Sequence, residues 1–200
     1  YSTTVMRARF ENVEIRYLEH GSELTVPVKR GLYEPSIAKF GDRFYLTMRN
    51  DDHGYVAVSD DGLVFSEPKR WTFDDGTDLG NYNTQQHWVA HSEAIFLVYT
   101  RRGANNDHVT RHRAPLFIAR IDPDTLQVIR SSEQVLVPEY GARLGNFGVT
   151  EISECETWVT VTEWMQSSSK EARTPDRVDR DSVRLRGRGA NNRVWVAKIK

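Results

Sequence analysis

The feature that most constrains the fold is a repeat of strand-like segments. The segment "EPSIAKFGDRFYLTMRN" (34–50) aligns with "QHWVAHSEAIFLVYTRR" (86–102) at an offset of 52 residues, which places Leu46 on Val98. A third segment, "NFGVTEISECETWVTVTEW" (146–164), repeats the same pattern. Each unit predicts a short first strand, a tight polar turn and a hydrophobic second strand.

Further strand-like runs follow in each unit. A third strand is predicted at "GYVAVSDDG", "PLFIARIDPDT" and "NRVWVAKIK", and a fourth around "KRWTF" and "EQVLVP" in the first two units. Four antiparallel strands in roughly 50 residues are typical of a β-propeller blade. Because a lone blade cannot bury both faces, blades stack side by side. The alternative is a β-sandwich whose strands are similar by accident.

We therefore expect an all-β chain, a β-propeller of four-stranded antiparallel blades in a single domain, 1–200. Residues 1–30 are expected to be the outer part of a preceding blade, and 166–193 a long loop insertion. The predicted blades are 31–83, 84–144 and 145–200. About three to four blades do not close a ring, which typically takes 4 to 8, so we expect a partial chain.

Composition limits the classes of binding partner that we expect. The net charge of −1 gives no overall attraction to nucleic acid or to an anionic membrane. No apolar run approaches the roughly 18 residues of a spanning helix. The single cysteine, Cys155, excludes an internal disulfide. We expect neither a nucleic acid nor a membrane as partner, and the sequence leaves the oligomeric state open.

One turn carries a family resemblance. The stretch "SDDGLVFSEP" (59–68) is similar to the Asp-box turn of sialidase-type propellers, through Ser59, Asp61, Gly62 and Phe65. Leu63 stands where the family has glycine, and the aromatic residue comes one position early. With the repeats, this turn makes the chain resemble sialidase-like, BNR-repeat propellers over most of 31–164. In that family the turn has a structural role.

A narrower resemblance concerns "QHW" and "NNDHV". These motifs are similar to those of propeller-type ulvan lyases and related polysaccharide lyases, which carry two catalytic-site histidines at a similar separation. His87 and His108 are 21 residues apart. The lyases also use a tyrosine and an arginine further along, and no tyrosine follows Tyr140. The arginines, Tyr–Glu pair and aspartate of true sialidases are not all matched either.

Alternating strand direction gathers the polar residues on one face. It places the starts of the first strands on the same face as the loops between second and third strands. Those loops, 49–54, 101–115 and 163–193, are the longest or most charged. We predict the site there, because function concentrates on loops held by a rigid scaffold.

The candidate residues follow from this face. The predicted catalytic residues are His87, His108 and Glu34, since histidine titrates near neutral pH and exchanges protons. A carboxylate-bearing sugar suits the forked guanidinium groups of arginine. The predicted substrate-binding residues are Arg49, Arg101, Arg113, Gln86, Asn106, Asn146 and Glu163. For each residue, the alternative is an ordinary structural role.

No cofactor and no metal ligands are predicted, with one alternative. Asp107 either orients His108 or binds a cation together with Asn105 and Asn106, whose oxygen ligands suit Ca²⁺. The resulting hypothesis is a sialidase-like glycoside hydrolase that cleaves an acidic oligo- or polysaccharide. The first alternative is a histidine-dependent polysaccharide lyase acting on a uronic-acid polymer by β-elimination. The second is a non-catalytic glycan- or protein-binding propeller. A secreted or periplasmic location follows only from the suggested substrate.

Overall fold

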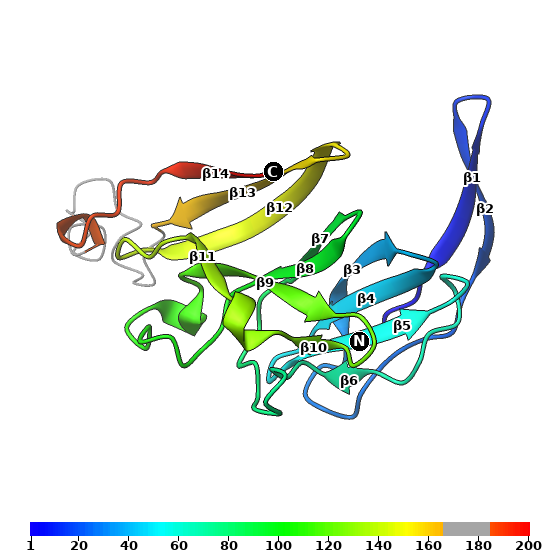
Figure 1. Cartoon of the computed structure of the whole chain (residues 1–200), viewed down its shortest axis with the longest axis horizontal. Helices are drawn as coiled ribbons and strands as arrows, with labels where there is room; N and C mark the ends of the chain where they lie inside the picture. The colour runs from blue at the N-terminus through cyan, green and yellow to red at the C-terminus, as the bar shows by residue number, and fades with distance from the viewer. Residues whose placement is uncertain (166–184) are drawn as a thin grey trace, which may run out of the picture.

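The computed structural model describes residues 1–165 and 185–200, and it is nearly all β (Figure 1). Its strands form four sheets, in which every pairing between the named strands is antiparallel. The predicted all-β class is confirmed. Most of the expected insertion 166–193, namely 166–184, lies outside the described residues.

The first sheet is a two-stranded hairpin of β1 (Met6–Glu11) and β2 (Glu14–His20). It stands away from the other sheets at one end of the molecule (Figure 1). Every residue of both strands is exposed, including Phe10 and Tyr17. The sequence predicted the second of these strands within "VEIRYL" but not the first.

The next sheet has the predicted four strands in sequence order. They are β3 (Tyr33–Phe40), β4 (Arg43–Arg49), β5 (Gly54–Ser59) and β6 (Lys69–Arg70). The turn after β5 is tied by side chains. Ser59 Oγ donates to Asp61 Oδ1 at 2.9 Å and accepts from the Gly62 amide at 2.9 Å. Asp61 Oδ1 accepts from two further backbone amides, each at 2.8 Å.

The following sheet has five strands rather than four. They are β7 (His87–His91), β8 (Ala94–Tyr99), β9 (Leu116–Asp122), β10 (Gln127–Val128) and β11 (Gln134–Val137). Both β10 and β11 pair with β9, because the chain turns between them through the 3-10 turn η2 (Arg130–Ser132). A second 3-10 turn, η1 (Thr110–His112), lies in the loop before β9.

The last sheet has three strands in the part of the chain that the structure describes. They are β12 (Arg143–Ser153), β13 (Glu156–Trp164) and β14 (Val194–Ile199). The expectation of four strands in each unit therefore holds for the β3–β6 sheet alone. The β7–β11 sheet differs because both β10 and β11 pair with β9. The number of blades and the closure of a ring stay predictions.

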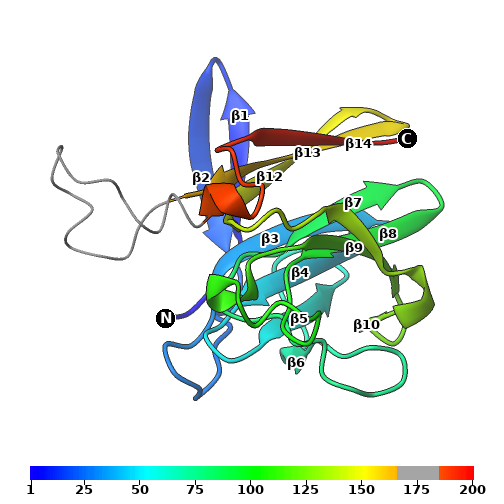
Figure 2. The same ribbon diagram turned by 90° about the vertical axis from the view of Figure 1, so that its left-hand side faces the viewer.

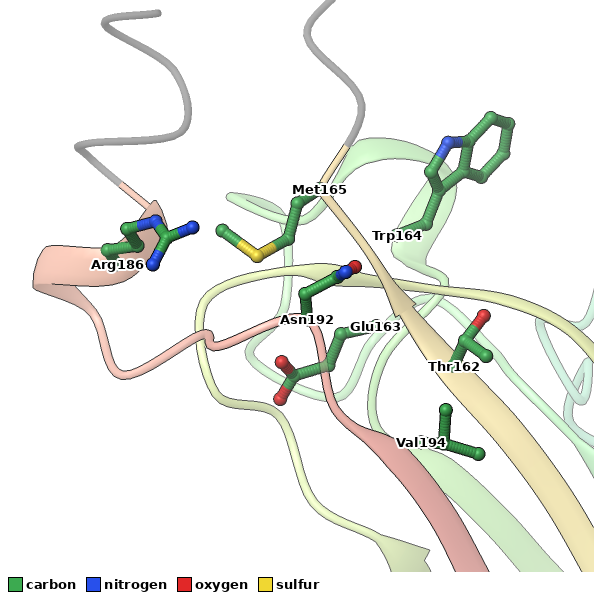
Figure 3. Close-up of a pocket in the computed structure, with 7 residues that line it drawn as sticks. All are labelled: Thr162, Glu163, Trp164, Met165, Arg186, Asn192 and Val194. Atoms are coloured by element: carbon green, nitrogen blue, oxygen red, sulfur yellow. The ribbon is translucent and has the colours of Figure 1, made fainter.

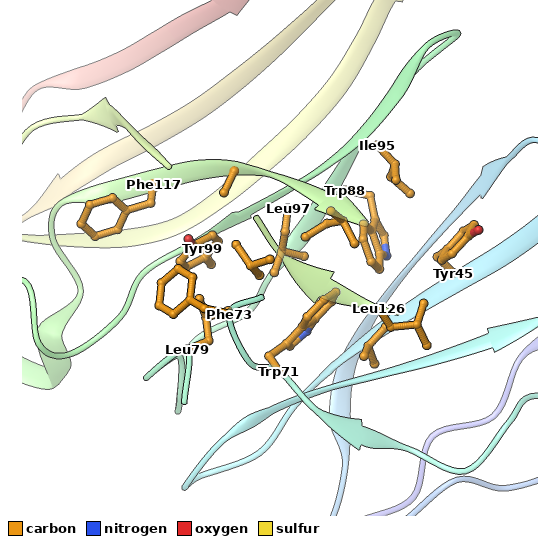
Figure 4. Packing of buried hydrophobic residues seen from close by; sticks show 14 residues of the cluster. Tyr45, Trp71, Phe73, Leu79, Trp88, Ile95, Leu97, Tyr99, Phe117 and Leu126 are labelled. Atoms are coloured by element: carbon orange, nitrogen blue, oxygen red, sulfur yellow. The ribbon is translucent and has the colours of Figure 1, made fainter. Parts of the chain in front are cut away.

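Apolar side chains pack between successive sheets. Trp88 of β7 packs against Trp71 and Tyr45, with ring centroids 5.6 Å and 6.1 Å apart (Figure 4). Its indole nitrogen donates to the Ser36 carbonyl at 3.0 Å, which ties β7 to β3. A second cluster joins β7–β9 to β12–β14, through Val89, Val98, Leu116, Phe147, Val159 and Val161. The sheets are thus held face to face, in sequence order (Figures 1 and 2).

Candidate functional site

One edge of the packed sheets gathers the polar residues predicted for the site. Glu34 lies near the start of β3, His87 starts β7 and Asn146 lies near the start of β12, while Arg49 ends β4. Arg113 lies just before β9, and its carbonyl accepts from the amide of a β12 residue at 2.8 Å. Because paired strands are antiparallel, these starts and ends meet at the same edge.

Arg49 holds this edge together through both of its terminal nitrogens. Its Nη1 donates to Glu34 Oε2 at 2.6 Å and its Nη2 donates to Asn83 Oδ1 at 2.6 Å. The guanidinium carbon lies 4.9 Å from the ring centroid of Tyr33. Glu34 itself has a φ of 47°, a left-handed conformation that is costly for a residue other than glycine. Arg49 therefore fixes Glu34 in place and joins β4 to the segment before β7.

Arg113 is a second buried cation at the edge. Its side chain is nearly covered, its Nη2 donates to Asn146 Oδ1 at 2.7 Å, and its guanidinium carbon lies 5.6 Å from the Trp164 ring. Burial and the neighbouring guanidinium groups lower the pKa of Arg113 to about 10, while Glu34 opposes the shift. Those neighbouring groups are Arg49, Arg111 and Arg143. Arg113 still carries its charge at neutral pH.

Among the described residues, no carboxylate forms an ion pair or hydrogen bond with Arg113. A buried charge without a counterion is costly, so this position favours an incoming anion. The planar guanidinium fork suits a carboxylate in particular. The guanidinium carbon of Arg143 lies 3.8 Å from the centroid of the same Trp164 ring, and its charge adds to the positive potential around Arg113.

His87 lies at the same edge, half covered, against the residue that follows Asn146. Its ring meets the Phe147 ring edge-on, with centroids 5.1 Å apart and planes at 88°. Burial lowers the pKa of His87, and the nearby Glu34 carboxylate and the Phe147 backbone only partly offset this. The imidazole is therefore neutral at neutral pH and has a free lone pair for a proton.

His108 lies elsewhere on the loops. Its side chain is 41% exposed, and its Nε2 lies 3.1 Å from Glu139 Oε2. In the described part of the chain, no hydrogen bond joins His108 to His87. The structure thus brings His87 near Glu34, and it places His87 and Arg113 on neighbouring residues of β12, Phe147 and Asn146. It does not join the two histidines by a hydrogen bond among the described residues.

Two of the predicted binding residues are occupied by loop contacts. Arg101 makes a two-fold ion pair with Glu133, Nε–Oε1 at 2.8 Å and Nη2–Oε2 at 2.7 Å, and Tyr99 donates to the same carboxylate at 2.7 Å. Asn106 is buried, and its side-chain nitrogen donates to the carbonyls of Arg101, His112 and Ala114. These two residues brace the 101–115 loop.

Gln86 is also turned into the structure. It is buried between β4 and β7, where its Oε1 accepts from Thr47 Oγ1 at 3.1 Å and its Nε2 donates to the Thr84 carbonyl at 2.7 Å. The sequence placed it at the strand entrance, which is correct for the backbone. The side-chain amide, however, makes its hydrogen bonds to Thr47 and Thr84 inside the protein.

Glu163 and Trp164 are consecutive on β13 and point in opposite directions (Figure 3). Glu163 Oε2 accepts from the amides of Asn191 and Arg193, at 2.8 Å and 3.0 Å, and so anchors the segment leading to β14. Both residues help to line an open pocket with Thr162, Met165, Arg186, Asn192 and Val194. Trp164 reaches the candidate site, and Glu163 does not contact Arg113.

Sequence reasoning missed Asn83 and Arg143 as parts of this edge. Asn83 lies in the polar stretch "NYNTQQH", directly before the predicted His87, and that polarity was the available signal. Arg143 starts β12 and gave no comparable signal, because a single arginine in a loop is usually solvated.

No metal centre is visible in the residues that the structure describes. Within 1–165 and 185–200, no three His, Cys, Asp or Glu side chains form a group that could hold a metal ion. Asn106 is engaged with carbonyl groups, and Asp107 lies 3.2 Å from His112 Nε2. The calcium alternative stays a prediction. In the same ranges, no helix has the length and apolar character needed to cross a membrane.

Comparison with known proteins places the chain by fold alone. Neither a family model nor a curated protein matches the sequence. An endo-arabinase from Bacteroides thetaiotaomicron is similar in structure, with a TM-score of 0.50, 9% identity, and coverage of 82% of this chain and 67% of the endo-arabinase. A protein of unknown function from Dyadobacter fermentans also has a TM-score of 0.50, with 16% identity and coverage of 76% and 38%.

A thermostable family-43 glycoside hydrolase is similar with a TM-score of 0.47, 14% identity and coverage of 70% of this chain. The chain spans 45% of that hydrolase, and 25% and 43% of two further solved structures, a glycoside hydrolase from Bacteroides ovatus and an N-acetylgalactosamine deacetylase from F. plautii. The chain thus corresponds to less than half the length of these three proteins.

Proposed function

We propose that this chain is part of a β-propeller carbohydrate-active enzyme that binds an acidic glycan through Arg113. The observation that carries the proposal is the environment of Arg113, a residue that is 4% exposed and whose guanidinium lacks a carboxylate partner among the described residues. Arg49 and Arg101 differ, since each is paired with a carboxylate. A uronic or sialic acid supplies the missing anion.

The neighbouring groups favour β-elimination from a uronic acid. With the sugar carboxylate on Arg113, the positive charge stabilises the negative charge that develops as the adjacent C–H bond loses its proton. Neutral His87 accepts that proton. The electron pair left behind forms the carbon–carbon double bond, the glycosidic C–O bond breaks, and the leaving oxygen takes up the proton that His87 has accepted.

Hydrolysis is the second candidate. Glycoside hydrolysis normally uses two carboxylic groups beside the scissile bond. Glu34 supplies one, with its side chain 41% exposed and one oxygen held by Arg49. Glu163 is turned to backbone amides and does not supply the second. The similarity to an endo-arabinase supports a saccharide ligand by analogy of fold. A sialidase-like specificity stays a prediction, as does a secreted or periplasmic location.

The test is a panel of polygalacturonate, hyaluronate and sialyllactose, with neutral arabinan as the uncharged comparison. Elimination creates an unsaturated uronate that absorbs ultraviolet light, whereas hydrolysis creates new reducing ends without this chromophore. Measurable binding to an acidic glycan without turnover would favour the non-catalytic alternative. Binding of arabinan alone would contradict the role of Arg113.

Arg113→Met should lower the affinity for the acidic glycan at least about tenfold, or about 1.4 kcal/mol, because it removes the charge and the fork while keeping much of the bulk. Isothermal titration measures this directly. Arg101→Met is the matched control, since that residue braces a loop through Glu133. It should lower the unfolding temperature without a comparable loss of affinity.

His87→Ala should reduce turnover of the acidic glycan by about a hundredfold or more, since a positioned base commonly contributes that much. Affinity should stay within about threefold of the original value, because Arg113 still binds the carboxylate. Turnover retained within about tenfold would show that His87 is not the base.

A further inference from the structure

A second group of titratable side chains lies beside the candidate site and is not used by the proposed function. The hydroxyl of Tyr82 lies 2.6 Å from His112 Nδ1, and His112 Nε2 lies 3.2 Å from Asp107 Oδ1. Three side chains from two loops thus form one hydrogen-bonded chain. The group adjoins the site through the backbone, because Asn83 follows Tyr82 and Arg113 follows His112.

The carboxylate decides which way the protons lie. A carboxylate only accepts hydrogen bonds, so the neutral imidazole of His112 donates Nε2–H to Asp107. Nδ1 is then the acceptor, and the Tyr82 hydroxyl donates to it. This order is the triad arrangement of a nucleophile, a base and a group that orients the base.

Two cations flank the phenol. The guanidinium carbon of Arg102 lies 4.7 Å from the Tyr82 ring centroid. Arg102 and Arg111 each act to lower the pKa of Tyr82, while burial acts more strongly to raise it. The phenol therefore stays protonated at rest and loses its proton only through His112, as the serine hydroxyl does in a serine triad.

The backbone at His112 is held in an unusual conformation. Arg111 and His112 have φ values of 58° and 51°, so two successive residues other than glycine are left-handed. Such strain persists where surrounding contacts fix it, and it concentrates at functional sites. Asn106 supplies such a contact, since its side-chain nitrogen reaches the His112 carbonyl.

We infer that Tyr82 is a nucleophile that accepts acyl groups from carboxylic esters, with His112 as its base and Asp107 orienting the imidazole. The Tyr82 oxygen bonds to the ester carbonyl carbon while the phenolic proton moves to His112 Nδ1. The bond from this carbon to the alcohol oxygen breaks, and the alcohol leaves with that proton. Water then attacks the acyl-tyrosine and gives a proton to His112. The carboxylic acid is released, and Tyr82 recovers the proton.

The experiment uses p-nitrophenyl acetate with the whole chain and needs no glycan, so it is independent of the function proposed above. Release of nitrophenolate is followed by absorbance, and acetylated tyrosines are located by peptide mass spectrometry. Tyr82 should be acetylated first among the 8 tyrosines. His112→Ala should slow this about a hundredfold and Asp107→Asn about tenfold.

Tyr17 is a control within the same molecule. Its hydroxyl lies 2.5 Å from His20 Nδ1, and no carboxylate is bonded to His20 among the described residues, so it is a phenol–imidazole pair without the third member. Its acetylation should be slower than that of Tyr82 and unchanged by Asp107→Asn. Because the Asp107 side chain is 94% exposed, this variant keeps the fold. Equal acetylation of Tyr17 and Tyr82, or an unchanged rate in Asp107→Asn, would overturn the inference.

Discussion

At the residue scale, burial lowers the pKa of both His87 and Arg113, but the two side chains end in different charge states. Burial disfavours the charged form of both side chains. Arg113 starts from so high a pKa that it stays charged even when lowered to about 10. His87 starts near neutrality, so the same influence leaves it uncharged. The same edge of the sheets thereby holds a cation and a neutral base, the two groups that the proposed elimination uses.

This difference predicts a dependence of stability on pH. The pKa of His87 is lower in the folded than in the unfolded chain, where it is about 6.5. Between these two values the unfolded chain binds more protons, so the free energy of unfolding falls as the pH falls through that window. His87→Gln should flatten this dependence, measured by urea unfolding at about pH 8 and about pH 5.5.

His108→Gln is the matched control, because the side chain of His108 is 41% exposed. This variant should keep the same difference in the free energy of unfolding between the two pH values as the original chain. The same loss of stability at acid pH in His87→Gln would show that burial does not control the charge of His87.

At the element scale, the repeat predicted where strands start and end, and this was enough to locate the edge. Glu34 and Arg49 meet because an antiparallel pair returns to the same end, which a strand pattern alone implies. The partners of loop residues were not predictable in this way. Arg101 pairs with Glu133, 32 residues away, across a turn between β10 and β11 that the pattern did not separate.

The turn after β5 gives a prediction at this scale. The Ser59 hydroxyl is buried, donates to Asp61 and accepts from the Gly62 amide. Ser59→Ala removes these bonds and should lower the free energy of unfolding by about 1–2 kcal/mol. Urea unfolding measures the change, with the exposed Ser153→Ala as control. A cost no greater than that of the control would mean that the turn does not depend on its side chains. The Asp-box resemblance itself stays a prediction.

At the scale of the whole molecule, the three sheets from β3 to β14 each pack on the next. Alternating apolar residues predicted that the strands would have buried faces, and the clusters between successive sheets show which faces meet. The pattern could not tell how many strands each sheet holds. The outer strands β6 and β10 are only two residues long, too short to leave a periodic signal.

Trp88 tests whether this stacking holds the molecule together. It is 5% exposed, packs on Trp71 and Tyr45, and donates to Ser36 across the junction of two sheets. Trp88→Ala should lower the free energy of unfolding by about 3–5 kcal/mol, because a cavity and an unpaired carbonyl remain. Trp88→Phe keeps part of the packing and should cost less. Denaturant unfolding followed by circular dichroism measures both. If the two variants cost the same small amount, packing at Trp88 does not couple the sheets, and the junction depends on the side-chain hydrogen bond between Thr47 and Gln86 instead.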